Sequence, residues 1–261
     1  MSAGHGLLRP VPREGHPAPT LLGVWAHPDD EAYLSAGLMA ALTAAGWRVV
    51  VATATRGESG TDDPEALPPA RLAAVRQQEL ADSLAVLGVT DHRWLRASRP
   101  LLDGELADLP EQEGAGIVAG LLEDVRPDLV VTFGPDGLTG HSDHRAVSRW
   151  TTRAWQQGGA CGELWYAALT SDFLARWGRL CTEQSVWMDG GPPAPVADAD
   201  LVHVEVCSGA RLDRKFAALA AHTSQTAGLI ARVGEERYRA WWSTEAFVSA
   251  AAVSSATTQA A

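Results

Sequence analysis

The chain has 261 residues, 46% of them hydrophobic and 20% charged, with a formal net charge of -11. That length and composition suit one α/β domain with a large core, whereas the negative charge disfavours partners that present a nucleic-acid backbone or an anionic membrane surface. No apolar run is long enough to span a membrane, and no signal peptide is expected at residues 1–19. Three cysteines without CxxC spacing favour packed thiols and a cytoplasmic location.

Strand-like and helical segments alternate between an expected irregular leader, residues 1–19, and an expected flexible tail, residues 251–261. In chain order the predicted strands are 20–26, 47–54, 92–96, 128–133, 163–169, 201–207 and 245–250. The predicted helices are 31–45, 70–87, 113–125, 143–156, 171–180, 209–222 and 234–241. This alternation predicts an α/β fold with one domain over residues 20–250, a mostly parallel sheet, and helices on both of its faces.

A histidine and three carboxylates follow the first predicted strand, in the segment Ala-His-Pro-Asp-Asp-Glu at 26–31. Like charges this close disfavour each other's ionised forms, so packing gives no reason to gather them. A divalent cation removes the conflict, because it binds His27 and one carboxylate and leaves another carboxylate free to act on water. The residues alone do not tell which of Asp29 and Asp30 binds the cation and which acts on the water.

A second cluster, Gly-His-Ser-Asp-His-Arg at 140–145, follows the predicted strand 128–133. Catalytic zinc typically has three His, Asp or Glu ligands and keeps one position open for water. Open α/β sheets bind ligands at the carboxyl ends of their strands, so we expect the two clusters to meet there. His27, Asp30 and one of His141 and His144 would complete a zinc site, whereas each residue taken alone would fit a turn or a solvated loop better than a metal site.

These paired motifs resemble those of the LmbE-like or PIG-L family of zinc-dependent de-N-acetylases. Three other segments are similar to family motifs: Thr-Arg-Gly-Glu-Ser-Gly at 55–60, Arg-Gln-Gln-Glu at 76–79, and the late segment 215–225 that ends in Ala-His-Thr-Ser-Gln. The resemblance covers roughly residues 20 to 228. It implies a Rossmann-like fold and hydrolysis of an N-acyl group, usually an acetyl group, on a small amino-sugar substrate.

The resemblance also implies a role for each motif residue. His27, Asp30 and His144 would hold zinc, and Asp29 would be the general base. His141 would stabilise the oxyanion of the tetrahedral intermediate. Arg76 matches an arginine that contacts substrate in the family.

Three of the motif residues also have other interpretations. Glu31 fits either a cap of the following helix or a partner of the site residues, and Asp143 fits either an N-cap or a carboxylate that orients a histidine. Arg76 fits a substrate contact, but its spacing to Glu79 also fits an ion pair on a helix surface.

Three functions are compatible with these observations. The first is a zinc-dependent N-deacetylase acting on an amino-sugar-like small molecule, and the second is an amidase of a thiol conjugate of the mycothiol type. The third is a non-catalytic α/β module that binds a sugar or nucleotide; the presence of every expected ligand and of the base argues against it, and there is no GxGxxG after the first strand. An oligomer is compatible with each of them.

Overall fold

The structure is a computed structural model that describes residues 18–159, 161–188 and 191–253. Its strands are β1 (Thr20–Trp25), β2 (Arg48–Thr53), β3 (Asp91–Trp94), β4 (Leu129–Phe133), β5 (Glu163–Ala168), β6 (Leu201–Val206) and β7 (Thr244–Ser249). Its helices are α1 (Asp30–Ala44), α2 (Pro69–Leu87), α3 (Glu111–Val125), α4 (Ser142–Gln157), α5 (Ser171–Glu183), α6 (Gly209–Ala221), α7 (Thr223–Val233) and α8 (Glu235–Trp241), with short 3-10 turns η1 (Leu106–Asp108) and η2 (Asp198–Asp200).

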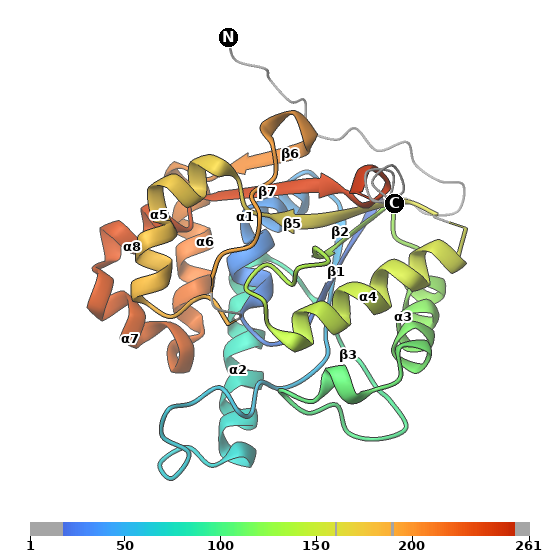
Figure 1. The fold of residues 1–261 in the computed structure, drawn as a ribbon, viewed down its shortest axis with the longest axis horizontal. Helices are drawn as coiled ribbons and strands as arrows, with labels where there is room; N and C mark the ends of the chain where they lie inside the picture. Colours follow the sequence, from blue (N-terminus) through green and yellow to red (C-terminus); the bar gives the residue numbers. More distant parts are fainter. Residues whose placement is uncertain (1–17, 160, 189–190, 254–261) are drawn as a thin grey trace.

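The strands form one sheet in the order β3-β2-β1-β4-β5-β7-β6 (Figure 1). β3, β2, β1, β4 and β5 pair in parallel, whereas β7 is antiparallel to both β5 and β6. The predicted α/β class with a mostly parallel sheet is therefore confirmed. The strand order reverses between β1 and β4, which is the position where open sheets of this kind bind ligands.

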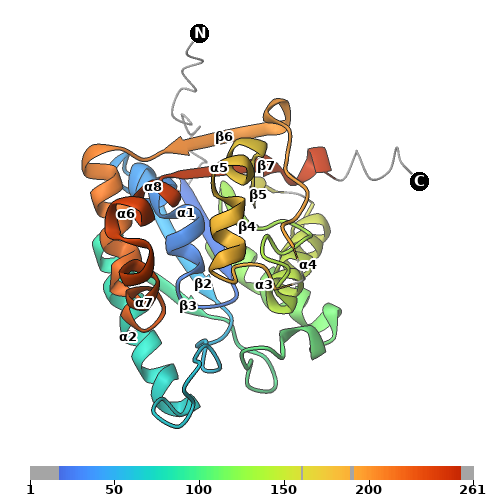
Figure 2. The same ribbon diagram turned by 60° about the vertical axis from the view of Figure 1, so that its left-hand side comes forward.

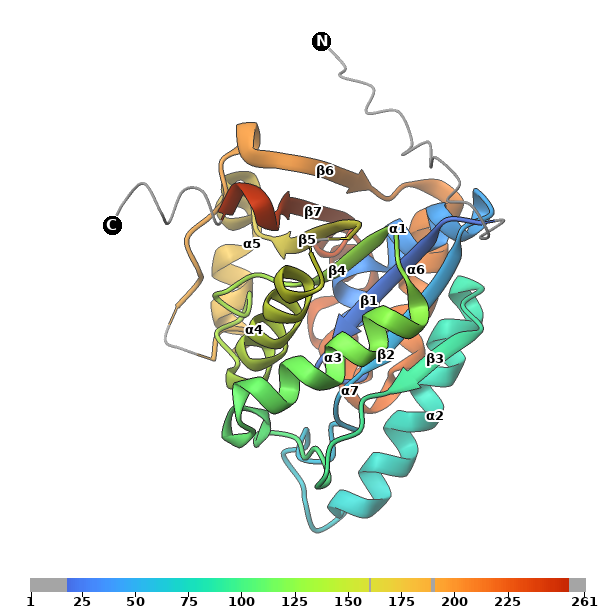
Figure 3. The same ribbon diagram turned by 90° about the vertical axis from the view of Figure 1, so that its right-hand side faces the viewer.

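Helices cover both faces of the sheet. α1 packs against β1 and β2 and contacts α2 and α6, whereas α4 packs against β1 and β4 and contacts α3. Figures 2 and 3 show α1, α2 and α6 on one side of the sheet and α3 and α4 on the other. The whole of β1 is buried between these layers, which explains its nearly continuous apolar sequence.

The end of helix α2 is determined by the residues that follow it. α2 ends at Leu87 because Gly88 adopts the left-handed conformation at φ 76°, and the amide of Val89 then donates to the carbonyl of Leu84 at 2.9 Å. One helix was not predicted: α7 begins at Thr223, directly after α6, within a segment rich in threonine and serine. Such residues are poor helix formers, and contacts with α2, α6 and α8 stabilise this helix instead.

Both ends of the chain extend beyond the described residues. Most of the predicted leader, residues 1–17, lies outside them, and β1 starts at Thr20. Residues 250–253 form a helical turn, and the remainder of the predicted tail, 254–261, is again outside the described residues. Among the helices described, none combines the length and apolar character that crossing a bilayer requires.

Candidate metal centre and active site

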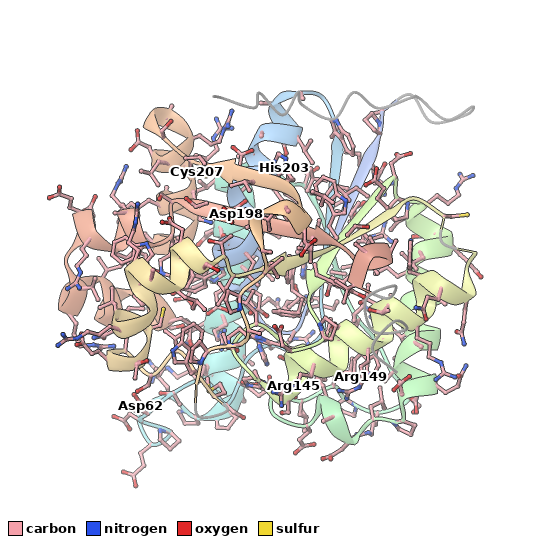
Figure 4. All side chains as sticks on the ribbon, turned by 45° about the horizontal axis from the view of Figure 1, so that its top comes forward. Asp62, Arg145, Arg149, Asp198, His203 and Cys207 are labelled. Carbon is pink, nitrogen blue, oxygen red and sulfur yellow. The ribbon has the colours of Figure 1, made fainter. Side chains whose placement is uncertain are left out.

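The two sequence clusters meet at the carboxyl edge of the sheet, at the reversal between β1 and β4. The first occupies the turn from β1 into α1, and the second occupies the start of α4, which follows β4. Figure 4 labels Asp62 in the loop after β2 and Arg145 and Arg149 on α4, all in the lower part of that view. In the same view His203 on β6 and Cys207, the residue after β6, lie in the upper part of the molecule.

Three predicted ligands converge on one point. His144 Nε2 lies 3.3 Å from His27 Nδ1 and 3.3 Å from Asp30 Oδ1, and His27 Nδ1 lies 3.6 Å from Asp30 Oδ2. Ligand atoms about 2.0–2.2 Å from a tetrahedral zinc ion are separated by about 3.3–3.6 Å, so these residues fit a zinc ion in number, type and spacing. All three side chains are buried.

The contacts of His144 leave Nε2 free to bind a metal. Its Nδ1 lies 3.0 Å from the carbonyl oxygen of Gly137, and because a carbonyl only accepts, Nδ1 carries the proton. The lone pair is then on Nε2, which faces His27 and Asp30. The ring also stacks on Phe133 with a centroid separation of 4.0 Å, which fixes its plane.

The carboxylates of Asp103 and Asp143 contact the Nε2 atom of the His27 ring. Its Nε2 lies 3.0 Å from Asp103 Oδ1 and 3.2 Å from Asp143 Oδ2, so Nε2–H donates to them and Nδ1 faces the metal position. Burial disfavours the imidazolium, but Asp103, Asp143 and Asp30 outweigh burial and raise the pKa of His27 well above its ordinary value. Metal binding would displace the Nδ1 proton.

Asp143 orients His27 and does not cap α4. Its carboxylate also accepts the amides of Gly104 at 2.8 Å and Leu106 at 3.1 Å, which ties the η1 segment to the site. The N-cap of α4 is His141, whose Nδ1 accepts the amide of Asp143 at 3.1 Å. The capping interpretation of Asp143 is therefore wrong.

That same cap fixes the orientation of His141. With Nδ1 accepting, a neutral His141 carries its proton on Nε2, where it can donate to a ligand. Burial, together with the neighbouring His27 and His144, lowers the pKa of His141 and favours this neutral form. His141 also lines the cavity described below.

Asp29 lies beside the predicted ligands in a strained backbone conformation. Its φ of 111° is rare for a residue with a side chain and costs about 1–3 kcal/mol. Burial raises the pKa of Asp29 to about 6, although the guanidinium of Arg76, with Nη2 3.3 Å from Asp29 Oδ2, opposes the rise. A carboxyl with this pKa is ionised at neutral pH and close to the range that suits a general base.

Glu31 stabilises the turn that contains Asp29 through hydrogen bonds of its carboxylate. Its Oε2 accepts the amide of Asp29 at 2.9 Å, while its Oε1 accepts the hydroxyl of Ser83 at 3.2 Å and lies 2.8 Å from His222 Nε2. Glu31 and His222 are fully buried. Both interpretations of Glu31 therefore apply, because one carboxylate caps the start of α1 and supports the site turn.

Arg76 does not form the surface ion pair with Glu79 that its spacing allowed. Its side chain is buried and donates through Nη1 to the Gly57 carbonyl at 2.8 Å and through Nη2 to the Pro28 carbonyl. Glu79 instead accepts the amide and hydroxyl of Ser224, each at 2.6 Å. Arg76 thus binds two loops of the site together while also lining the cavity.

A cavity of about 280 Å³ opens onto these groups. It is lined by the predicted residues His27, Asp29, Asp30, Arg76, His141 and His144. The sequence did not point to several other lining residues, namely Tyr33, Asp103, Val186, Met188 and Leu229, whereas Gln225 belongs to the late segment that resembles a family motif. The segments 55–65, 97–112 and 134–142 each contribute to the lining, and segments that follow β5 in the chain line the remaining side.

The chain is similar to known proteins in both sequence and fold. Residues 22–155 match the family model described as PIG-L, GlcNAc-PI de-N-acetylase. A 1D-myo-inositol 2-acetamido-2-deoxy-alpha-D-glucopyranoside deacetylase from Acidothermus cellulolyticus is 32% identical over 80% of this chain and 80% of its own length. A deacetylase of the same name from Catenulispora acidiphila is 38% identical over 55% of this chain, but the match spans only 53% of that protein.

Solved structures share the fold. N,N'-diacetylchitobiose deacetylase from Pyrococcus horikoshii superposes with a TM-score of 0.58 at 22% identity, over 85% of this chain and 76% of that one. The 4-carboxy-2-hydroxymuconate hydratase from Pseudomonas putida does so with a TM-score of 0.54 at 14% identity, over 89% and 96%. Since the same fold carries both chemistries, the side chains of the site must decide the function.

Proposed function

Because this chain belongs to the PIG-L family, we propose that it is a zinc-dependent N-deacetylase that removes an acetyl group from a small amino-sugar substrate. The observation that carries the proposal is the convergence of His27, Asp30 and His144 beside Asp29, a carboxylate that the ligand set leaves unused. One further group, His141, presents an N–H to the same cavity.

In the proposed mechanism zinc, when bound, would polarise the acetyl carbonyl and acidify a water molecule. Asp29 accepts the proton of the attacking water and later returns it to the amine that leaves. His141 donates Nε2–H to the oxygen of the tetrahedral intermediate, a type of contact whose loss typically costs about 2.7–4 kcal/mol of barrier. Arg76 holds Asp29 in position through its carboxylate and through the preceding carbonyl of Pro28.

The cavity supports a small substrate. Its volume of about 280 Å³ lies near the lower limit of small-molecule sites, which is about 300 Å³. Tyr33 and Trp242 offer an apolar wall, and Asp103 and Gln225 offer groups that bond hydroxyls. The relatives named above act on an N-acetylglucosamine glycoside of inositol. We therefore propose one N-acetyl sugar as the occupant of the cavity.

We also propose a cytoplasmic location, which the free thiols of the three cysteines support.

Acetate release from a panel of substrates tests the proposal. The panel contains N-acetylglucosamine glycosides, an N-acetylated thiol conjugate, and an N-acyl glucosamine with a longer chain, each assayed with zinc-loaded wild type and with Asp29→Asn. We expect acetate from the glycosides with wild type alone. Preferred cleavage of the thiol conjugate would favour the amidase instead, and binding without release of acetate would favour the non-catalytic module.

A further inference from the structure

Tyr33 lies one helical turn beyond the proposed base and borders the same cavity. The amide of Tyr33 donates to the carbonyl of Asp29 at 3.0 Å, which is the spacing of one turn of α1. Long side chains in a helix point back toward its start, so the Tyr33 side chain leans toward the turn that contains Asp29. Both side chains line the catalytic cavity. The mechanism proposed above uses the Tyr33 ring as an apolar wall and gives its hydroxyl no role.

The hydroxyl of Tyr33 accepts one hydrogen bond and keeps a proton to donate. Tyr238 on α8 is fully buried, and its hydroxyl donates to the Tyr33 oxygen at 2.8 Å. Among the residues that the structure describes, none accepts the proton of Tyr33. A hydroxyl that accepts becomes a better donor, because hydrogen bonds in a chain polarise one another. The O–H of Tyr33 is therefore available to a ligand in the cavity.

The surroundings of Tyr33 keep this hydroxyl protonated. Burial raises the pKa of Tyr33 above its ordinary value, and the negative charge of Asp29 adds to the rise. The bond from Tyr238 and the charge of Arg76 oppose the rise without cancelling it. At neutral pH the side chain is thus a neutral donor beside the carboxylate of Asp29.

Contacts from other elements fix the position of Tyr33. Lys215 on α6 donates through Nζ to the Tyr33 carbonyl at 2.8 Å, and Glu245 Oε1 lies 2.6 Å from the same Nζ. The Tyr33 ring lies edge-on to Trp242, the residue after α8, with a centroid separation of 4.7 Å. A donor held in this way loses little conformational freedom when a ligand binds, so its hydrogen bond contributes more to affinity.

The hydroxyl of Tyr33 and the metal centre are held from different sides of the molecule. His141 and His144 lie at the start of α4, whereas the Tyr33 hydroxyl is bonded from α8. Figures 1 and 2 show α7 and α8 on one side of the molecule and α4 on the other. Gln225 on α7 and Trp242 after α8 also line the cavity. Because the proposed mechanism places the acetyl oxygen at the metal and His141, the part of the substrate near Tyr33 is the sugar ring.

From these contacts we infer that Tyr33 donates its hydroxyl proton to one hydroxyl of the sugar ring and thereby selects substrates that carry it. The inference rests on the proposed N-deacetylase function and adds a substrate contact that neither the metal centre nor the base provides. A sugar hydroxyl has two lone pairs and accepts such a bond readily. A site built to bond a hydroxyl rejects an analogue without it, because the buried donor is then left unpaired.

The test removes each partner of this hydrogen bond in turn. Zinc-loaded wild type and Tyr33→Phe are assayed with methyl 2-acetamido-2-deoxy-glucoside and with its 3-deoxy, 4-deoxy and 6-deoxy analogues. We expect wild type to lose roughly tenfold in kcat/KM with one analogue, as for an unpaired buried donor. Tyr33→Phe should lose about as much with the parent glycoside and should treat that analogue and the parent alike. If wild type treats all four glycosides alike, or if Tyr33→Phe keeps the discrimination, the inference is overturned.

The other two of the three tyrosines in the chain supply matched controls. Tyr238→Phe breaks the same pair of hydroxyls but leaves the proton of Tyr33 in place, so it should keep the wild-type discrimination. Tyr166→Phe loses a hydroxyl bond of 2.7 Å to Thr152, at a position that does not line the cavity, and should keep wild-type kinetics. Melting temperatures confirm that each variant folds. Equal loss of discrimination in Tyr238→Phe and Tyr33→Phe would indicate a purely structural role and overturn the inference.

Calorimetry separates this inference from the proposed function, because it needs no turnover. Zinc-loaded Asp29→Asn is titrated with the four glycosides, with and without Tyr33→Phe. If wild type hydrolyses none of them but Tyr33→Phe still abolishes a difference in Kd between the parent and one analogue, the proposed function fails and the contact stands. If the glycosides are hydrolysed and Tyr33→Phe changes neither Kd nor kcat/KM, the proposed function stands and the inference is overturned.

Discussion

At the residue scale, each histidine of the centre is fixed by a contact on the side away from the metal position. The Gly137 carbonyl determines the tautomer of His144, and Asp103 and Asp143 determine that of His27. Such partners orient the ligand nitrogens toward the metal position before a metal arrives. The metal site thus depends on residues from three connecting segments, after β1, β3 and β4, although its predicted ligands come from two of them.

We expect His144→Ala to lower zinc stoichiometry well below one ion per chain, because it removes one of three ligands. Metal analysis of dialysed protein measures this. His203→Ala serves as the control, since His203 lies on β6, an edge strand of the sheet, and does not line the catalytic cavity. Unchanged zinc content in His144→Ala would contradict the ligand assignment.

We expect Asp29→Asn to keep zinc and to lose about 10²–10⁴ in kcat, the usual range for a general base. Asparagine has nearly the same shape but does not accept the proton of the water. Steady-state kinetics and metal analysis of the same preparation test both parts. Near-wild-type turnover would move the role to another carboxylate of the cavity.

Arg76→Ala is expected to impair both activity and folding. The substitution leaves the carbonyls of Pro28 and Gly57 without their buried donor, which costs about 1–3 kcal/mol of unfolding free energy. It also releases Asp29, so kcat/KM should fall by a similar free energy. Denaturant unfolding and kinetics are compared with Arg71→Ala, an exposed arginine on the same helix. Full stability of Arg76→Ala would contradict the bridging role.

At the scale of elements, the start of α1 depends on two other helical segments. Glu31 connects the strained turn at Asp29 to Ser83 on α2 and to His222, between α6 and α7. Burial disfavours a charged His222, but Glu31 outweighs burial and raises the pKa of His222 above its ordinary value; Asp29 adds to the rise and Arg76 opposes it.

The stability that this contact provides should depend on pH. Because the folded pKa is raised, the contribution is fully present below the unfolded value of about 6.5 and is lost as the pH rises through the folded value. The difference in unfolding free energy between wild type and His222→Gln should therefore be larger at acidic pH than at alkaline pH. Denaturant unfolding across that range measures it, and a constant difference would contradict the charged pair.

At the scale of the whole molecule, a metal bound at the reversal of the sheet connects distant parts of the chain. Its ligands follow β1 and β4, which are separated by the whole β2–α3 segment. An unfolded chain does not present such a site, so metal binding stabilises the folded state alone.

We therefore expect chelation to lower the melting temperature. Zinc at about 100 times its Kd adds about 2.7 kcal/mol, which corresponds to roughly 5–10 °C in a chain of this size. Calorimetry before and after removal of zinc measures the change, and restored zinc should reverse it. The melting temperature of His144→Ala should not respond to the chelator.

Local sequence alone predicted most of the fold and the two clusters of histidines and carboxylates from which the proposed ligands come. The buried strands β1, β2 and β4 appear as apolar runs, and the histidines and carboxylates that follow β1 and β4 mark one edge of a parallel sheet. The apolar runs and the polar residues after them depend only on residues adjacent in the chain and on the geometry of parallel strands. They can therefore be predicted from the sequence.

Only the tertiary structure decided which distant residues complete the site. The spacing of Arg76 and Glu79 fits a surface pair, but α2 turns Arg76 inward toward the loops after β1 and β2. The contacts of Asp103 and His222 cannot be predicted from local sequence, because their partners lie 76 and 191 residues away. Such contacts, like the packing that stabilises α7, arise when separate segments are brought together, and no periodicity along the chain encodes them.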